Sequence, residues 1–312
     1  MKVFVYAPHA KEYCRRIRER IPELEVVSEK PGEDQSRDIA DAEIMIAWQF
    51  PLEILGKASR LRWIQLTSAG VDQLLEARDR LKDVIVTNTR GIHIDAMADY
   101  ALGAMVMLQR NFARFFLHQQ HRKWSRRITE PLAGKTLGIV GVGAVGREIA
   151  RRAQIFGMSV IGVKRNPAPT EMVSRLFGPD RLDEMLSLSD FVVLSVPATP
   201  ETYRMIGESE LRTMKETCYL INISRGSVVD ESALIQALQQ KWIAGAVLDV
   251  FEKEPLPRES PLWALENVII TPHIAGDFEG YVERVIRIFS ENFAQWKSDN
   301  PLINEVDLAK GY

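Results

Sequence analysis

The sequence has few cysteines and no long apolar run, and each absence excludes a class of protein. Only Cys14 and Cys218 occur among the 312 residues, and neither lies in a CxxC pair or at a metal-ligand spacing. A disulfide-stapled secreted scaffold is therefore excluded, and a reducing, cytoplasmic compartment is favoured. No apolar run reaches the roughly 18 residues that a membrane span needs, so we expect no membrane partner.

An excess of charge of one sign is also lacking. Lys and Arg number 40 and Asp and Glu number 42, which gives a net charge of −2. A protein that binds nucleic acid or an anionic membrane would carry a basic excess, so neither partner is expected. The opening residues MKVFVYAP predict a strand rather than a signal peptide, because no long apolar segment follows a basic one.

What the sequence does contain is a regular alternation of short apolar runs and longer amphipathic stretches. The expected strands of a first part are 2–7, 43–47, 62–66 and 84–88, with helices at 10–21 and 51–58. The pattern restarts, with expected strands at 136–141, 158–163, 190–196, 218–223, 243–248 and 267–271. This alternation predicts an α/β fold made of two Rossmann-like, doubly wound domains, each with a parallel sheet.

Two long helices are expected to connect these domains. Residues 95–120 predict one continuous helix with Asp95 as its N-cap, and its apolar positions are too dense for a single surface stripe. A last helix at about 279–297 should return the chain to the first domain. The second domain is then inserted into the first. The expected domains are a discontinuous one, 1–96 and 279–312, and an inserted one, 97–278.

A glycine-rich turn lies between a predicted strand and a predicted helix. It consists of Gly141, Val142, Gly143, Ala144, Val145 and Gly146. In a GxGxxG turn the first glycine permits the tight turn, the second lets the backbone approach a pyrophosphate, and the third lets the helix pack on the strand. The N–H groups at the start of the helix then face the phosphates. This order predicts a dinucleotide site, and a turn without a ligand is the alternative. The inserted part, 97–278, is then the dinucleotide-binding domain or cofactor domain, and 1–96 with 279–312 form the substrate domain.

The end of the second strand distinguishes two cofactors. NAD enzymes usually place Asp or Glu there, bonded to the ribose 2′-hydroxyl. This strand ends instead in Lys164, Arg165 and Asn166. Two cations attract a 2′-phosphate, and no carboxylate repels it. NADP(H) is therefore the predicted cofactor, with NAD(H) as the alternative if both side chains are simply solvated.

Three downstream segments place polar residues at strand ends, where ligands of open α/β sheets bind. They are 223–226 (ISRG), 248–255 (LDVFEKEP) and 271–276 (TPHIAG). Each residue also has a purely structural interpretation when taken alone. Arg225 could form a strand-end ion pair, Glu254 could be a solvated charge, and His273 could cap a turn.

With these motifs the sequence resembles the D-isomer-specific 2-hydroxyacid dehydrogenase family. The resemblance extends through 141–158, 196–202 (VPATPET), 222–231 (NISRGSVVDE), 245–255 and 271–276, nearly the whole chain. It implies hydride transfer between NADP(H) and a small 2-oxoacid or D-2-hydroxyacid, with glyoxylate or hydroxypyruvate as first substrates. The alternatives are a phosphoglycerate dehydrogenase without a regulatory domain and a non-catalytic, nucleotide-sensing protein of the same fold.

The resemblance also implies roles for individual residues. Arg225 would bind the carboxylate and carbonyl of the substrate, and His273 would exchange a proton with the carbonyl oxygen. Glu254 would orient His273 and favour its protonated form. Related formate dehydrogenases carry Gln at this position, so the Glu favours proton-coupled carbonyl reduction.

Backbone N–H groups of Ala69 and Gly70 would meet the substrate carboxylate, because small residues let the backbone approach closely. Asp249 would lie near the nicotinamide carboxamide. The implied cofactor-binding residues are Gly141, Gly143, Ala144, Val145, Gly146, Lys164, Arg165, Val196, Pro197, Thr202, Ile223, Ser224, Asp249 and Gly276.

Other aromatic and imidazole side chains allow more than one interpretation. Trp48 and Gln49 either line the pocket for the substrate side chain or belong to the core. Trp124 either reaches the site of a neighbouring subunit, as the resemblance implies for a homodimer, or simply packs. His118 and His121 lie three residues apart, but no third ligand is near, so no metal is expected.

Overall fold

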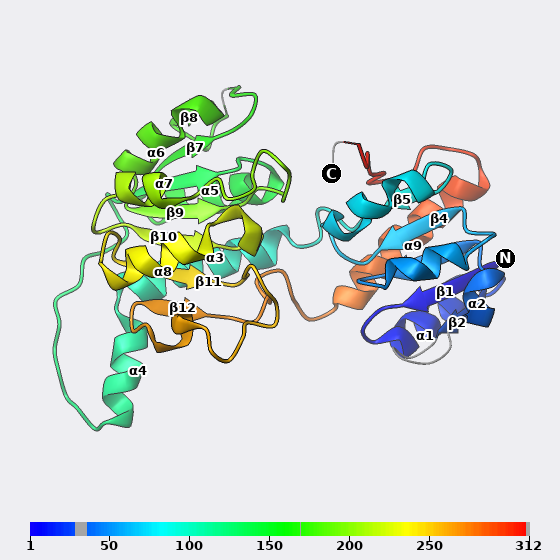
Figure 1. The fold of residues 1–312 in the computed structure, drawn as a ribbon, viewed down its shortest axis with the longest axis horizontal. Helices are drawn as coiled ribbons and strands as arrows, with labels where there is room; N and C mark the ends of the chain where they lie inside the picture. Colours follow the sequence, from blue (N-terminus) through cyan, green and yellow to red (C-terminus); the bar gives the residue numbers. More distant parts are fainter. Residues whose placement is uncertain (29–35, 169, 310–312) are drawn as a thin grey trace. The chain divides into compact units, whose positions relative to one another are not determined.

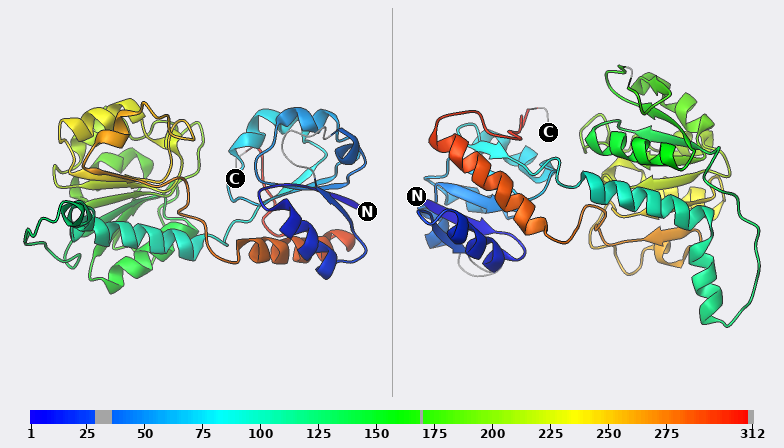
Figure 2. Two further views of the ribbon diagram at one scale, coloured as in Figure 1. Left: turned by 90° about the horizontal axis from the view of Figure 1, so that it is seen from below. Right: turned by 180° about the vertical axis from the view of Figure 1, so that it is seen from behind.

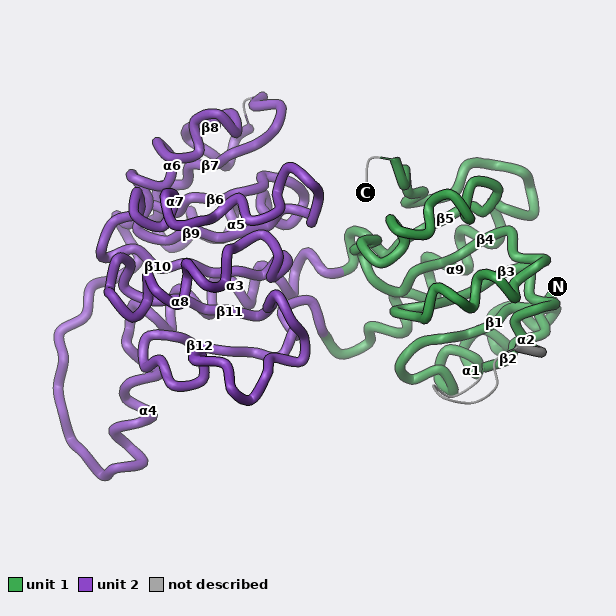
Figure 3. The backbone as a smooth tube through the Cα atoms, in the orientation of Figure 1, with its two compact units in different colours: residues 1–92, 278–312 green, residues 93–277 purple. Residues whose placement is uncertain are grey.

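The computed structural model describes residues 1–28, 36–168 and 170–309. The chain divides into two compact units, residues 1–92 with 278–312 and residues 93–277 (Figure 3). The sequence placed the boundaries of the inserted part at 97 and 278. Both units contain a fully parallel sheet with helices, so the predicted pair of Rossmann-like α/β domains is confirmed. None of the described helices is long and apolar enough to cross a membrane.

The first unit contains a five-stranded sheet in the order β2-β1-β3-β4-β5 (Figure 1). Its strands are β1 (Lys2–Tyr6), β2 (Glu25–Ser28), β3 (Ile44–Ala47), β4 (Trp63–Leu66) and β5 (Ile85–Thr87). Its helices are α1 (Ala10–Arg20), α2 (Ser36–Ala40) and α9 (Tyr281–Lys297), with 3₁₀ helices η1 (Leu52–Gly56) and η2 (Asp72–Arg80). Alternate strand residues face opposite layers: Val3 and Val5 pack with α1 and α9, whereas Phe4 packs with η1 and η2.

The second unit contains a seven-stranded sheet in the order β12-β11-β10-β9-β6-β7-β8. Its strands are β6 (Thr136–Val140), β7 (Ser159–Val163), β8 (Arg175–Phe177), β9 (Phe191–Leu194), β10 (Tyr219–Asn222), β11 (Gly245–Leu248) and β12 (Val268–Ile270). Its helices are α3 (Ile94–Gln109), α4 (Phe112–Gln120), α5 (Ala144–Ile155), α6 (Leu182–Leu188), α7 (Glu208–Thr213) and α8 (Glu231–Gln239), with short 3₁₀ turns η3 (Pro179–Arg181), η4 (Gly226–Val228) and η5 (Pro261–Ala264).

Two hydrophobic layers cover this second sheet. One packs α3 and α5 against one face, and the other packs α6, α7 and α8 against the opposite face (Figure 2). Because β6 pairs with β7 on one side and with β9 on the other, the strand order reverses beside β6. Open α/β sheets bind their ligands at such a reversal, beyond the carboxyl ends of the strands.

The prediction of one helix over 95–120 was wrong. The structure has α3 and α4 instead, separated by Arg110 and Asn111, and the φ of 55° at Asn111 lies in the left-handed region. Asn tolerates this conformation better than most residues, so it permits the break. Asp95 is also not the N-cap. That position is held by His93, and Asp95 lies in the first turn of α3.

Two strands, β2 and β8, were missed by the sequence analysis. Both lie at the edge of their sheets. An edge strand has only one paired neighbour and often carries charged residues, which weaken an apolar pattern. In β2 the first residue is the exposed Glu25, and in β8 it is the exposed Arg175. The other predicted strands each contain an observed one.

Candidate active site

The glycine-rich turn connects β6 to α5. Gly141 has a φ of +98°, and a Cβ there would lie 2.4 Å from the Ser195 carbonyl oxygen. A Cβ at Gly146 would lie 2.4 Å from the carbonyl oxygen of Gly141. Both positions therefore exclude a side chain. Gly143 instead faces open space within 4 Å, and it is the N-cap of α5. The turn is tight where it meets the sheet and open where a phosphate would approach.

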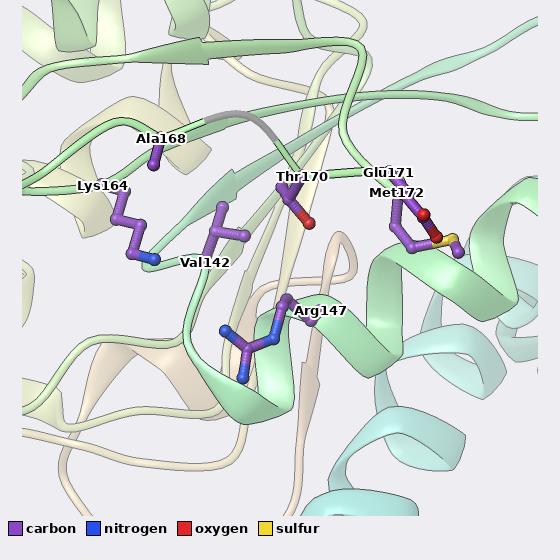
Figure 4. Close-up of a pocket in the computed structure, with 7 residues that line it drawn as sticks. All are labelled: Val142, Arg147, Lys164, Ala168, Thr170, Glu171 and Met172. Carbon is purple, nitrogen blue, oxygen red and sulfur yellow. The ribbon is translucent and has the colours of Figure 1, made fainter.

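A cavity of about 420 Å³ lies beside this turn, at the end of β7 (Figure 4). It is lined by Val142, Arg147, Lys164, Ala168, Thr170, Glu171 and Met172. Lys164, predicted from the strand end, lines the cavity, whereas Arg165 is exposed and is not among the lining residues. Sequence reasoning missed Arg147. Its only signal was a cation placed directly after the third glycine of the turn.

The structure brings His273 and Glu254, which the sequence predicted to act as an acid–base pair, together within the second unit. His273 follows β12, and Glu254 lies in the loop after β11. The Nδ1 atom of His273 lies 2.7 Å from Oε2 of Glu254, and the Phe251 N–H donates to Oε1 of Glu254 at 3.0 Å. These contacts fix the carboxylate from two directions. The imidazole is thus held through Nδ1, which leaves its other nitrogen for a substrate.

The two partners shift each other's protonation. The hydrogen bond with Glu254 raises the pKa of His273 above its ordinary value, against the lowering effect of burial. Burial acts to raise the pKa of Glu254, but the hydrogen bonds from His273 and Phe251 hold it below its ordinary value. The charge of Arg225 acts on both groups, lowering both pKa values. The structure therefore brings Arg225, Glu254 and His273 within electrostatic reach of one another.

Asp249 holds the segment that carries His273. Its side chain is buried, with Oδ1 accepting from the Thr271 hydroxyl at 2.5 Å and from the Ile274 N–H at 2.9 Å. Oδ2 accepts from the Ala275 N–H at 2.8 Å, and the His273 N–H donates to the Asp249 carbonyl at 2.8 Å. These bonds fix a turn in which His273 adopts a φ of 56°. The nicotinamide contact of Asp249 stays a prediction.

Asn222 and Gly226 position Arg225, and sequence reasoning assigned no role to either. Asn222 is buried; its Nδ2 donates to the Arg225 carbonyl at 3.0 Å, and its Oδ1 accepts from the Ser224 N–H and hydroxyl. A Cβ at Gly226 would lie 1.9 Å from the carbonyl carbon of Phe251. The missing side chain lets the turn after β10 touch the turn after β11, so the arginine and glutamate segments are packed together.

Of the remaining predicted cofactor residues, Ala144 and Val145 begin α5, and the others lie in loops of the second unit. Val196 and Pro197 follow β9, and the Thr202 hydroxyl closes their loop by donating to the Pro197 carbonyl at 2.6 Å. Ile223 and Ser224 follow β10. The Gly276 carbonyl lies 3.2 Å from Nδ1 of His93, which joins the two ends of the unit. Their contacts with a cofactor stay predictions.

Four predicted substrate-side residues belong to the first unit. Ala69 and Gly70 lie in the loop after β4, where the Asn88 side chain donates to the Ala69 carbonyl at 2.8 Å. Trp48 and Gln49 follow β3, and Trp48 is 41% exposed, so it does not belong to the core. The loop of Trp48 is held by the Gln73 side chain, which donates to the Trp48 carbonyl. No group of three His, Cys, Asp or Glu in the described ranges could hold a metal ion.

Known proteins resemble this chain along most of its length. A model of the "D-isomer specific 2-hydroxyacid dehydrogenase, NAD binding domain" matches residues 102–275. The glyoxylate reductase of Thermococcus gammatolerans is 37% identical over 276 residues, 85% of this chain and 82% of that protein.

Solved structures agree with these sequence matches. A D-isomer specific 2-hydroxyacid dehydrogenase family protein from Aeromonas salmonicida is 34% identical, with a TM-score of 0.91 over 98% of this chain and 99% of that one. The NADPH-dependent glyoxylate/hydroxypyruvate reductase of Sinorhizobium meliloti, in complex with NADP and sulfate, is 26% identical. Its TM-score is 0.90, over 100% of this chain and 99% of that one.

A doubly wound unit with a dinucleotide-type glycine turn and a His–Glu pair beyond its strand ends is typical of NAD(P)-dependent oxidoreductases. Within that class, the chain belongs to the D-isomer-specific 2-hydroxyacid dehydrogenase family. The resemblance stated from the motifs is thereby confirmed.

Proposed function

We propose that this enzyme reduces a small 2-oxoacid, glyoxylate or hydroxypyruvate first, to the corresponding 2-hydroxyacid with NADPH. The observation that carries the proposal is the 2.7 Å contact between His273 and Glu254 within electrostatic reach of Arg225. The pair combines a proton donor with a cation suited to a carboxylate, which are the two groups that a 2-oxoacid requires. The names of the glyoxylate reductase relative and of the Sinorhizobium enzyme support this substrate class.

Arg225, His273 and Glu254 each have a distinct role in the proposed reaction. The planar guanidinium of Arg225 binds the substrate carboxylate and orients the carbonyl group. When bound, a reduced nicotinamide would supply the hydride that the carbonyl carbon accepts. Protonated His273 donates its proton to the carbonyl oxygen, and Glu254 stabilises the imidazolium before that transfer. In the reverse direction neutral His273 accepts the proton. The carboxylate contacts of Ala69 and Gly70 stay predictions from the resemblance.

The glycine-rich turn fits a dinucleotide because, of its three glycines, Gly143 is the one that faces open space, where α5 begins. The strand end at Lys164 carries no acid to bind a ribose 2′-hydroxyl, and a cation there suits a 2′-phosphate. These two observations support NADP(H) as the preferred cofactor, with NAD(H) as the weaker one. NADP bound to the Sinorhizobium relative agrees with this preference.

Cofactor preference is tested by kcat/KM values for NADPH and NADH with a panel of 2-oxoacids, followed by the absorbance of the reduced nicotinamide. We expect NADPH to be favoured by about tenfold or more, the effect of one charge-assisted contact. Lys164→Asp should shift the ratio toward NADH, because a carboxylate repels a 2′-phosphate and accepts from a 2′-hydroxyl. The exposed Lys11→Asp serves as the charge-matched control. A preference for NADH in the wild type contradicts the cofactor, and no turnover with any 2-oxoacid contradicts the reaction.

The pH dependence of reduction is expected to report on Glu254. Carbonyl reduction needs protonated His273, so kcat/KM should fall as the pH rises through the pKa of His273. Because Glu254 raises this pKa, Glu254→Gln should move the fall to lower pH. In the oxidative direction, activity should then begin at lower pH than in the wild type. Identical profiles for the two proteins would contradict the assigned coupling.

We also propose that the enzyme works as a cytoplasmic homodimer. In the second unit, α4 and the segment after it extend away from the sheet layers (Figure 2). They expose large apolar side chains: Phe112, Phe116, Leu117, Trp124 and Ile128. Exposed large apolar side chains that are concentrated in one segment of a globular protein favour an interface with another protein. A second copy of the chain is the partner that the family resemblance favours.

A further inference from the structure

Two cationic side chains line the cavity beside the glycine-rich turn, and they come from different elements. Arg147 lies in the first turn of α5, directly after Gly146, and Lys164 directly follows β7. The cavity volume of about 420 Å³ lies within the roughly 300–1,000 Å³ of ordinary ligand pockets. Arg147 and Lys164 are 17 positions apart in the sequence, yet the parallel pairing of β6 with β7 brings both to one edge of the sheet. The cavity therefore combines two positive charges at the strand end where a cofactor's ribose is expected.

The other arginines of α5 are already paired. Arg151 and Arg152 bind the Glu148 carboxylate at 2.6 and 2.7 Å, and Arg152 also binds Asp95 at 2.7 Å. The hydrogen bonds from Arg151 and then Arg152 lower the pKa of Glu148 to about 2. This carboxylate, the residue next to Arg147, is thus committed to other partners. In the described part of the chain, no ion pair or side-chain hydrogen bond occupies Arg147.

Lys164, like Arg147, has no acidic partner among the described residues. Within residues 1–28, 36–168 and 170–309, no carboxylate forms an ion pair with Lys164. Glu171 is the acid among the lining residues, and it lies beside Met172, whereas the Arg147 guanidinium extends toward the side of Lys164 (Figure 4). Two cations and one carboxylate leave a net positive charge. A phosphate monoester, which carries between one and two negative charges, complements that charge.

We propose that Arg147 is a specificity-determining residue that binds the 2′-phosphate of NADP(H) together with Lys164. The inference rests on the proposed NADP(H) preference, and it adds Arg147 of α5 to the residues that determine this preference. A guanidinium donates two parallel hydrogen bonds to phosphate oxygens, while the Lys164 ammonium acts as a point charge on the other side. Arg165 acts on a residue outside this cavity, Glu201. The pKa of Glu201 is lowered by its hydrogen bond with Thr199 and, more weakly, by the charge of Arg165.

The test measures binding to the full-length protein, without turnover. Isothermal titration with adenosine 2′,5′-bisphosphate probes the 2′-phosphate contact, and adenosine 5′-monophosphate is the matched ligand that lacks it. Arg147→Gln should weaken binding of the bisphosphate about 10- to 100-fold, the range for hydrogen bonds to a charged group. Binding of the monophosphate should stay within about twofold, because the removed contact is absent from that ligand.

Arg212→Gln is the matched control, because it removes one exposed positive charge from α7, which packs on the face of the same sheet opposite α5. It should leave the binding of both ligands unaffected, since an exposed charge on that face is screened at physiological salt. Equal losses in Arg147→Gln and Arg212→Gln, or equal losses for the two ligands, would overturn the inference. If Lys164→Gln and Arg165→Gln weaken bisphosphate binding but Arg147→Gln does not, the NADP(H) preference stands and the role of Arg147 fails. Wild-type protein that binds the monophosphate as tightly as the bisphosphate would overturn the cofactor proposal itself.

Discussion

His273→Asn is expected to lower kcat/KM for 2-oxoacid reduction by about 10²- to 10⁴-fold, the usual contribution of a general acid. The amide of Asn cannot donate a proton to the developing alkoxide. Binding of NADPH should stay close to the wild-type value, because neither the glycine-rich turn nor the Lys164 cavity involves His273. Steady-state kinetics and titration of NADPH against the protein measure the two quantities separately.

Asn is the suitable replacement because residue 273 has a φ of 56°. Among non-glycine residues, Asn adopts this left-handed conformation with little strain, whereas Ala would add strain to the turn. The thermal unfolding midpoint of His273→Asn should therefore match the wild type, which separates a chemical effect from a structural one. Activity within tenfold of the wild type would contradict the assigned acid. Loss of NADPH binding with unchanged folding would show that His273 acts on the cofactor instead.

The sequence predicted the fold well because the signals were local. A buried parallel strand is a short apolar run, and a glycine-rich turn is six consecutive residues, so neither depends on distant contacts. The break at Asn111 was missed because the apolar pattern continues across it through Phe112, Phe115 and Phe116. Only the structure shows that no residue of α4 is buried, so that this pattern does not mark a buried face.

The charged side chains of the candidate site could be predicted from the sequence, but the residues that hold them in place could not. Arg225, Glu254 and His273 followed from ordered motifs and a family resemblance. The roles of Asn222 and Asp249 depend on hydrogen bonds made by buried side chains to backbone groups of their turns. Residue type alone cannot reveal such bonds, because a buried Asn or Asp has many geometrically different partners. Arg147 was missed for a related reason: its role depends on the pairing register of β6 with β7.

Gly226→Ala should be the most damaging single methyl group that can be added near the site. The new Cβ would lie 1.9 Å from the Phe251 carbonyl carbon and 2.4 Å from the Glu252 nitrogen. Both are backbone atoms, so no side-chain rotation can relieve the overlap, and the turns that carry Arg225 and Glu254 must separate. We expect the free energy of unfolding to fall by about 3 kcal/mol or more, at the upper end of overpacking effects. Reductase activity of any folded protein should fall as well, because Glu254 would move relative to His273.

Gly103→Ala is the matched control for this substitution. Gly103 lies within α3, and a Cβ there would meet nothing within 4 Å. Replacing a glycine inside a helix with alanine normally stabilises a protein by about 0.5–1 kcal/mol, so the two variants should change stability in opposite directions. Denaturant unfolding of both proteins measures the difference. A stability of Gly226→Ala within about 0.5 kcal/mol of the wild type would contradict the close approach of the two turns. Stable Gly226→Ala protein with full activity would further show that the positions of Arg225 and Glu254 do not depend on that packing.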